Sequence, residues 1–189
     1  MKILLTGANG YIGMRLLPQL LEMEHEIVCA VRDESRLSVD KEIRSNIQII
    51  EIDFLEEPKE NIVPKDIDAA YFLIHSMSSS TQDFDNMEAK TAVNFNKYVN
   101  NTNIKQVIYL SGIVNDEKLS KHLQSRKNVE DILYQGKYNL TVLRAGIIVG
   151  SGSSSFEIIR DLCEKLPVMI TPKWVLTKTQ PIAIRDVIA

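Results

Sequence analysis

The stretch that decides the fold is "KILLTGANGYIG", residues 2–13. Its first half, "KILLT" (2–6), is a short and mainly apolar run, which predicts a buried β-strand. Its second half places Gly7, Gly10 and Gly13 at intervals of three residues. Apolar residues at helical spacing follow, so the stretch predicts a strand, a glycine-rich turn and the start of a helix. The apolar stripe of this helix consists of Ile12, Leu16, Leu17, Leu20 and Leu21.

Glycines at this spacing, between a strand and a helix, are typical of a turn that holds a dinucleotide. Gly7 would permit the tight turn, Gly10 would let the backbone approach a pyrophosphate, and Gly13 would let the helix pack closely on the sheet. The amides near Tyr11 and Ile12 would then meet the diphosphate at the positive end of the helix dipole. A turn with a purely structural purpose is the alternative. The cofactor-binding residues predicted in the turn are Gly7, Asn9, Gly10, Tyr11, Ile12 and Gly13.

Apolar runs and helical segments alternate along the rest of the chain. Most of the runs are continuously apolar, which is typical of parallel strands covered on both faces. Right-handed crossovers between such strands give an α/β fold of Rossmann type, a doubly wound parallel sheet with helices on both faces. The further strands are predicted at 26–31, 47–52, 69–74, 106–111 and 140–149, and the further helices at about 81–101, at 121–135 and from Ser154 onward.

The composition narrows the class of protein. The chain has 189 residues, of which 44% are apolar and 25% charged, with a net charge of −3. This balance argues against nucleic acid as a partner, because no basic stripe is present to bind phosphates. Two distant cysteines, Cys29 and Cys163, indicate neither a disulfide framework nor a metal site. No run is long enough to span a bilayer or to act as an export signal, so we expect a cytoplasmic protein with a small-molecule ligand.

The organisation of the chain is simple. No internal repeat is visible, so we expect a single domain over residues 1–189. Its last residues, "PIAIRDVIA", read as the beginning of a helix, which suggests that the domain continues beyond Ala189. The oligomeric state stays open.

The ends of three strands carry further cofactor candidates. In "VRDESR" (31–36), Arg32 would bind the 2′-phosphate of NADP, whereas Asp33 would bind the ribose 2′-hydroxyl of NAD. The position of Arg32 favours NADP; NAD, or a simple surface ion pair of Arg32, is the alternative. Asp53 and Phe54 end the third strand, where they would edge the adenine. His75 follows the fourth strand and would contact the ribose region, or else is a histidine satisfied within its loop.

These motifs resemble those of extended and atypical short-chain dehydrogenases/reductases. Several later segments are similar to a bacterial NmrA-like subgroup, whose members are described as NAD(P)-binding or epimerase-like and commonly continue into a further C-terminal region. A more distant likeness is to the nucleotide-binding accessory subunit of respiratory complex I, which has this fold without the main redox chemistry. The segments that carry the resemblance are "TGANGYIG", "VRD", "IDF", "YFLIHSM", "YLSGIV", "LSKHLQSR", "LRAGIIVGSGSSSFEIIR", "LPVMITPKWV" and "QPIAIRDV".

The resemblance also implies where a catalytic site lies. At two of its positions this sequence has other residues than the family. Typical reductases use a serine at the end of the fifth strand, with a tyrosine and a lysine four residues apart on the next helix. Here Ser111 is in place, but His122 and Arg126 occupy the other positions. His122 could donate a proton, and Arg126 could hold ribose hydroxyls while its charge depresses the pKa of His122. The alternative is a cofactor clamp without chemistry.

Two functions remain open at this point. The first is an NADP(H)-dependent oxidoreductase that moves a hydride to or from a carbonyl or sugar-like substrate, or epimerises through a transient ketone. The second is a sensor or scaffold protein that binds NADP(H) without turnover. The serine-rich stretch 151–155 could close over the nicotinamide as a lid. The identity of the substrate cannot be read from the residues.

Overall fold

A computed structural model describes residues 1–59, 61–75, 84–113, 121–166 and 178–189. Its main sheet has six strands, all parallel, in the order β3-β2-β1-β4-β5-β6. This order reverses direction at β1, which defines a doubly wound Rossmann sheet. The predicted fold class is therefore confirmed. The strands are β1 (Lys2–Thr6), β2 (Glu26–Val31), β3 (Ile47–Glu51), β4 (Ala69–Phe72), β5 (Gln106–Gly112) and β6 (Asn139–Ala145).

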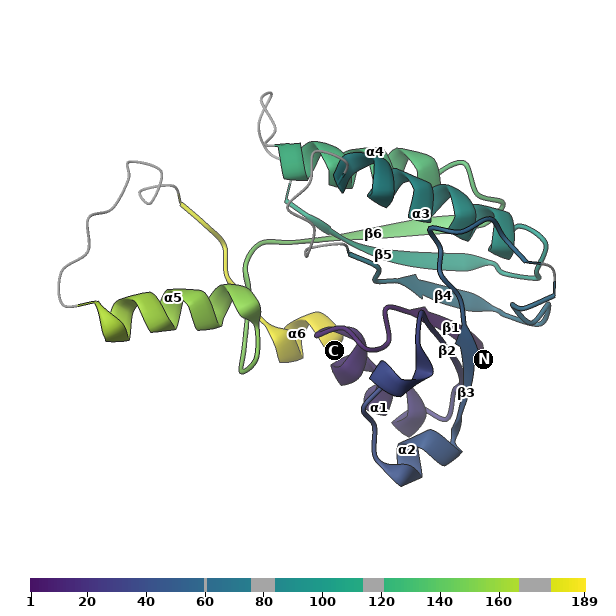
Figure 1. The fold of residues 1–189 in the computed structure, drawn as a ribbon, viewed down its shortest axis with the longest axis horizontal. Coiled ribbons are helices and arrows are strands. Elements are labelled where there is room, and N and C mark those ends of the chain that lie inside the picture. The colour runs from purple at the N-terminus through teal and green to yellow at the C-terminus, as the bar shows by residue number, and fades with distance from the viewer. Residues whose placement is uncertain (60, 76–83, 114–120, 167–177) are drawn as a thin grey trace.

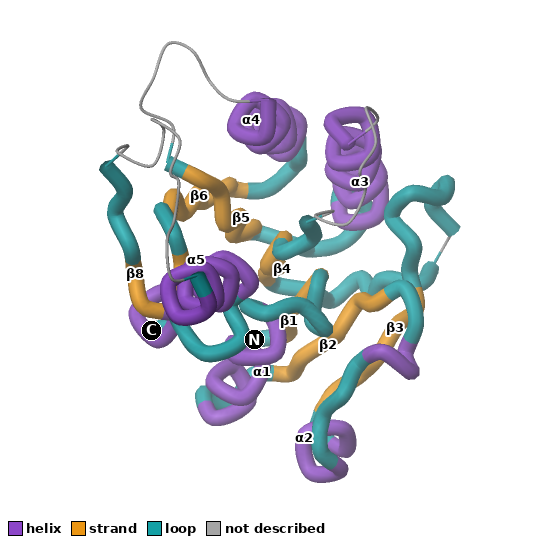
Figure 2. Tube along the Cα trace, turned by 60° about the vertical axis from the view of Figure 1, so that its left-hand side comes forward, coloured by secondary structure: helices purple, strands orange, loops and turns teal. Residues whose placement is uncertain are grey.

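Helices cover both faces of this sheet. Helices α3 and α4 lie side by side on one face, and α1 lies on the other (Figures 1 and 2). The segments predicted as helices are helical with slightly different ends; residues 81–83 lie outside the described part. The helices are α1 (Gly13–Glu22), α2 (Lys41–Ser45), α3 (Phe84–Val99), α4 (Lys121–Leu133), α5 (Ser154–Lys165) and α6 (Ile184–Ile188), with a 3-10 turn, η1 (Glu34–Arg36).

Alternate residues of β1 and β2 enter two separate cores, as the two-residue period of a strand requires. Leu4 and Val28 face α3 and α4, whereas their neighbours Ile3 and Ile27 face α1. The core under α3 and α4 is the more aromatic one: it holds Phe54, Phe72, Phe95, Tyr98 and Tyr109. The ring of Phe95 packs edge-on against Phe72 with 4.9 Å between centroids, so this residue joins the helix to the sheet.

The predicted strand 140–149 is wrong in its second half. Strand β6 ends at Ala145, and residues 148 and 149 form a separate short strand, β7 (Ile148–Val149), that pairs with β8 (Ile182–Ala183). The break falls at Gly146, where an added Cβ would lie 2.1 Å from the carbonyl oxygen of Gln180. The backbone of a distant segment therefore approaches this glycine closely and turns the chain out of the main sheet.

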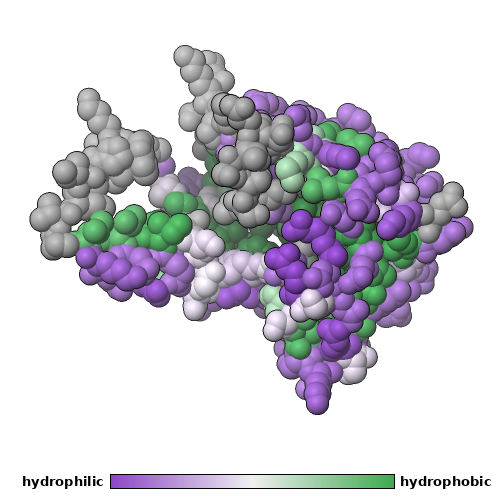
Figure 3. Space-filling view, in the orientation of Figure 1, coloured by the Kyte–Doolittle hydropathy of each residue, from purple (hydrophilic) through white to green (hydrophobic). Residues whose placement is uncertain are grey.

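Helix α5 follows β7 and extends away from the main sheet (Figure 1). Apolar side chains gather along one side of it in the space-filling view (Figure 3). The exposed large apolar residues of this segment are Phe156, Ile158, Ile159, Leu162 and Leu166. These side chains therefore contribute to the surface and not to either core of the sheet. No described helix is both long enough and apolar enough to cross a membrane.

The packing of Phe95 yields a stability prediction. Phe95→Ala should lower the free energy of unfolding by about 3–5 kcal/mol, because it empties a fully buried site between the helix and the sheet. Val93→Ala on the same helix is the matched control: Val93 is 40% exposed, and its loss should change stability by less than about 0.5 kcal/mol. Urea denaturation measures both values. Equal effects of the two substitutions would contradict this account of the core.

Candidate functional site

The three glycines of the turn have different structural roles. Gly7 has a φ of +66°, and a Cβ there would lie 2.7 Å from the carbonyl oxygen of Leu73. At Gly13 a Cβ would lie 2.4 Å from the carbonyl oxygen of Gly7. At Gly10 the added atom would meet only that same oxygen, at 3.1 Å, and would otherwise face open space. Gly7 and Gly13 thus hold the turn together, while Gly10 leaves room beside it.

The backbone amides of the turn divide into used and unused donors. The amide of Gly10 donates to Gly7 over 2.9 Å, which closes the turn. Within the described ranges the amides of Tyr11 and Ile12 donate to no acceptor, and no side chain caps the start of α1. Unused amides at a helix start attract a phosphate group. The glycine-lined space and these two donors fit the pyrophosphate of a dinucleotide.

Arg15, which the sequence analysis did not identify as a site residue, joins this turn to the segment after β7. The guanidinium of Arg15 stacks on the ring of Tyr11, 3.9 Å from its centroid, and donates to the Tyr11 carbonyl over 3.0 Å. It also donates to the carbonyl of Ser151 over 2.6 Å. The four-residue spacing of Tyr11 and Arg15 was the available signal. The stretch 151–155 therefore begins against the coenzyme turn; its use as a lid stays a prediction.

The acidic and basic residues after β2 are placed differently. The carboxylate of Asp33 accepts from the amide and the hydroxyl of Ser35, at 2.9 and 2.6 Å, and so caps η1. These hydrogen bonds hold the pKa of Asp33 below its usual value. Arg32 is exposed at the strand end and forms no ion pair with any described residue. The arginine is thus available to a ligand, while the aspartate is engaged in its own turn.

The two residues predicted to edge the adenine also differ. Asp53 accepts from the amide of Leu55 over 2.9 Å, which fixes the turn after β3. The ring of Phe54 is buried against Phe95 and Tyr98, with centroids 6.1 and 5.6 Å away. Phe54 therefore serves the aromatic core with its ring, and its contact with an adenine stays a prediction.

Ser111 and Arg126 meet at the carboxyl end of β5. The hydroxyl of Ser111 is buried, and it has no hydrogen-bond partner among the described residues. Arg126 reaches back from α4 to the same strand, donating to the carbonyl of Leu110 over 3.1 Å and to the hydroxyl of Tyr109 over 3.4 Å. A buried hydroxyl without a partner costs free energy unless a ligand completes it.

The two histidines of this edge lie next to one another. The ring of His75 is 5.2 Å from that of His122, measured between centroids, with 52° between the planes. Burial lowers the pKa of His122, and the nearby charges of His75 and Arg126 lower it further. The ring of His122 is therefore neutral near pH 7. The structure thus brings Ser111, His122, Arg126 and His75 to one edge of the sheet, beyond the ends of β4 and β5.

A buried carboxylate that the sequence analysis missed completes this cluster. Glu88 on α3 accepts from Nδ1 of His75 over 2.6 Å and from the hydroxyl of Ser125 on α4 over 2.7 Å. Burial raises its pKa, but the hydrogen bonds from His75 and Ser125, with the charges of His75 and Arg126, outweigh this and leave the pKa of Glu88 below its usual value. The sequence signal for Glu88 was its place on the same helix face as Thr91 and Phe95, because a charge on a buried helix face needs a partner.

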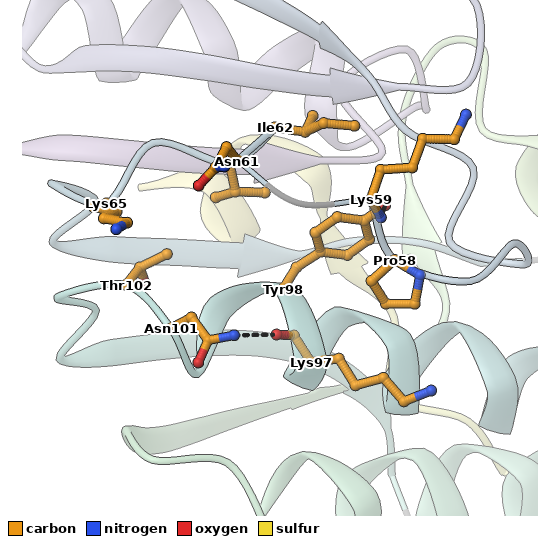
Figure 4. Close-up of a pocket in the computed structure, with 10 residues that line it drawn as sticks. Pro58, Lys59, Asn61, Ile62, Lys65, Lys97, Tyr98, Asn101 and Thr102 are labelled. Atoms are coloured by element: carbon orange, nitrogen blue, oxygen red, sulfur yellow. Dashed lines mark hydrogen bonds between the residues drawn. The ribbon is translucent and has the colours of Figure 1, made fainter.

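A surface pocket elsewhere in the chain contains none of the predicted site residues (Figure 4). Residues of the β3–β4 connection and of the end of α3 line it, among them Tyr98 and Lys65. The amide of Asn103 donates to the carbonyl of Lys65 over 2.8 Å, so this side of the pocket lies where β4 and β5 begin. Ligands of doubly wound sheets bind at the opposite edge, where the strands end.

The geometry of the turn predicts different effects of two alanine substitutions. Gly10→Ala should leave the unfolding midpoint nearly unchanged and weaken NADPH binding about tenfold or more, because the methyl group enters the space beside the unused amides. Gly13→Ala should lower the free energy of unfolding by about 1–3 kcal/mol, because its Cβ meets backbone atoms. Calorimetric titration and thermal unfolding measure the two effects. A Gly10→Ala protein that binds NADPH like wild type would contradict the assignment.

Solved structures share this fold. UDP-glucuronic acid 4-epimerase from Bacillus cereus, in complex with a fluorinated UDP-glucuronic acid and NAD, has a TM-score of 0.74 and 21% identity, and the match covers all of this chain and 71% of that chain. A protein from Bacillus halodurans described as an NAD-dependent epimerase/dehydratase has a TM-score of 0.71 and 22% identity, over all of this chain and 84% of that chain. An NAD-dependent NDP-hexosamine 5,6-dehydratase of tunicamycin biosynthesis, TunA, has a TM-score of 0.71 and 18% identity, over 99% and 69%. These TM-scores show a common fold.

The family of the chain follows from a match to its sequence. No curated protein matches the chain. A family model described as NAD(P)H-binding matches residues 7–162, a span that runs from the first glycine of the turn into α5. It includes the turn, the end of β2 and the cluster of Ser111, His122 and Arg126. By this match the chain belongs to the NAD(P)H-binding family.

Proposed function

We propose that the protein is an NADP(H)-dependent oxidoreductase that transfers a hydride between the coenzyme and the carbonyl of a small, sugar-like substrate. The observation that carries this proposal is the buried hydroxyl of Ser111, which has no partner among the described residues. It lies at the carboxyl edge of the sheet, where dinucleotides bind in this fold. The nucleotide-sugar substrates of the B. cereus epimerase suggest the sugar-like class.

The glycine turn and the end of β2 would hold the coenzyme. The amides of Tyr11 and Ile12 would bind the pyrophosphate, and the space beside Gly10 would admit it. Arg32 would bind the 2′-phosphate of NADP, because its guanidinium has no ion pair among the described residues and Asp33 is occupied by Ser35. His75 would lie near the ribose region, and Asp53 would lie at the edge of the adenine. A cytoplasmic location stays a prediction.

The residues at the end of β5 would then act on the substrate. Bound NADPH would supply the hydride. Ser111 would orient the substrate oxygen with its hydroxyl, and a ring N–H of the neutral His122 would donate to the same oxygen as negative charge develops there. Arg126, anchored on Leu110, is a permanent cation and does not pass on a proton, but its fixed charge favours an oxyanion nearby.

Binding without turnover is the second candidate. One observation favours it: the guanidinium that stands where reductases carry a lysine is directed at the carbonyl of Leu110 and the hydroxyl of Tyr109. In this alternative Arg126 and His122 would stiffen the end of β5 and form one wall of a coenzyme site. The protein would then report the level of NADP(H) to a partner.

Steady-state assays separate the two candidates. We expect the wild-type protein to oxidise NADPH with at least one member of a panel of aldehydes, keto sugars and nucleotide-bound keto sugars. Ser111→Ala and His122→Gln should each lower kcat about 100-fold, because both groups act on the substrate oxygen, with little change in NADPH affinity. An NADPH-bound wild type that is inactive on the whole panel would favour the sensor candidate.

The preference for NADP rests on a single side chain and is tested separately. Arg32→Ala should weaken NADPH binding about tenfold or more and leave NADH binding unchanged, because only NADPH has a phosphate for the guanidinium. Arg44→Ala is the matched control, since this arginine pairs with Glu34 on the surface and should leave both affinities unchanged. Equal losses for NADPH and NADH in Arg32→Ala would contradict the proposed role.

A further inference from the structure

Glu88 on α3 is a buried charge whose two partners come from two other segments. Its side chain is 5% exposed, on the inner face of α3. One carboxylate oxygen accepts from His75, after β4, and the other accepts from Ser125 on α4. Burying a carboxylate is costly unless it is paired and hydrogen-bonded. Two donors on two oxygens meet this cost, so the carboxylate stays ionised in the core.

This arrangement decides which nitrogen of His75 carries a proton. An ionised carboxylate only accepts hydrogen bonds, so Nδ1 of His75, at 2.6 Å from Oε1 of Glu88, must be the donor. The second ring nitrogen, Nε2, then carries the proton that the imidazole gains or loses. Glu88 therefore fixes both the tautomer and the orientation of the His75 ring.

The ring of His75 lies next to the ring of His122. Their centroids are 5.2 Å apart, and His122 is on the next helix of the same layer, three residues before Ser125. His122 is kept neutral by burial and by the charges of His75 and Arg126. A neutral imidazole gives up a proton readily only if its other nitrogen receives one at the same time. His75 lies beside His122 and is such a proton source.

We propose that Glu88 and His75 form a proton relay that acts through His122 in place of the missing tyrosine–lysine pair. This inference rests on the proposed hydride transfer. If hydride from bound coenzyme reached the substrate carbonyl, the resulting alkoxide oxygen would take the proton of one ring nitrogen of His122, and an O–H bond would replace an N–H bond. The other nitrogen of His122 takes the Nε2 proton of the His75 imidazolium. His75 becomes neutral, keeps its Nδ1 proton on Glu88, and is protonated again from water.

Kinetics of three variants test the relay. At saturating NADPH, His75→Ala should lower kcat about 100-fold, and added imidazole should restore part of the lost rate, because it fills the vacated site beside His122. Glu88→Gln should lower kcat about tenfold or more with little change in KM, because the ionised acceptor that fixes the His75 ring is replaced by an amide. Glu130→Gln is the matched control. Glu130 is also a buried carboxylate, on α4, but it pairs with Arg144 at 2.6 Å, so its loss should lower Tm and leave kcat within about twofold.

A measurement on the wild-type protein covers the case in which the variants do not fold. In ¹⁵N-histidine spectra Nδ1 of His75 should carry a proton and be hydrogen-bonded, whether or not Nε2 is also protonated. A His75 ring protonated on Nε2 alone would overturn the inference, as would wild-type kcat in both His75→Ala and Glu88→Gln while His122→Gln is inactive. That kinetic result would leave the proposed function standing. A wild type that binds NADPH but transfers no hydride would overturn the function and the relay together.

Discussion

The contact between the start of α1 and the end of β1 is the constraint on which the site depends. Gly13 lies so close to the backbone of Gly7 that no side chain fits between them. The helix therefore starts close to the strand end, at the carboxyl edge of the sheet, whose order reverses at β1, and the amides of Tyr11 and Ile12 just before it donate to no described acceptor. A wider turn would cover these donors with side chains or leave them to water. The proposed coenzyme site thus follows from backbone packing.

The aromatic core on the other face places the second half of the site. Phe95 and Tyr109 pack α3 and α4 against β4 and β5. With the helices fixed in this way, the polar residues at the helix starts, Glu88 and His122, meet the loop after β4 and the end of β5. Burial then does two things at once: it excludes water from Glu88, and it keeps His122 neutral. The stability of the fold and the charge state of the site have a common cause.

Periodicity and glycine spacing were sufficient to predict a parallel sheet and the glycine-rich turn between its first strand and first helix, because these patterns lie within short segments of the sequence. Interactions between distant segments were not predictable in the same way. The early end of β6 depends on the backbone of Gln180 meeting Gly146, thirty-four positions away in the chain. The partners of Glu88 and the reach of Arg15 to Ser151 likewise depend on tertiary packing. The capping of η1 by Asp33 depends only on neighbouring residues. The fold, however, made a ligand-binding role for this carboxylate the more obvious interpretation.

The most direct test of the account is to follow backbone amide resonances by NMR while NADPH is added to the wild-type protein. The amides of Tyr11 and Ile12 should shift most, because they gain a phosphate acceptor that the protein itself does not provide. Residues around the pocket at Tyr98, at the opposite edge, should not move. Binding of NADPH that leaves Tyr11 and Ile12 unchanged, or that shifts the Tyr98 region, would contradict the central claim.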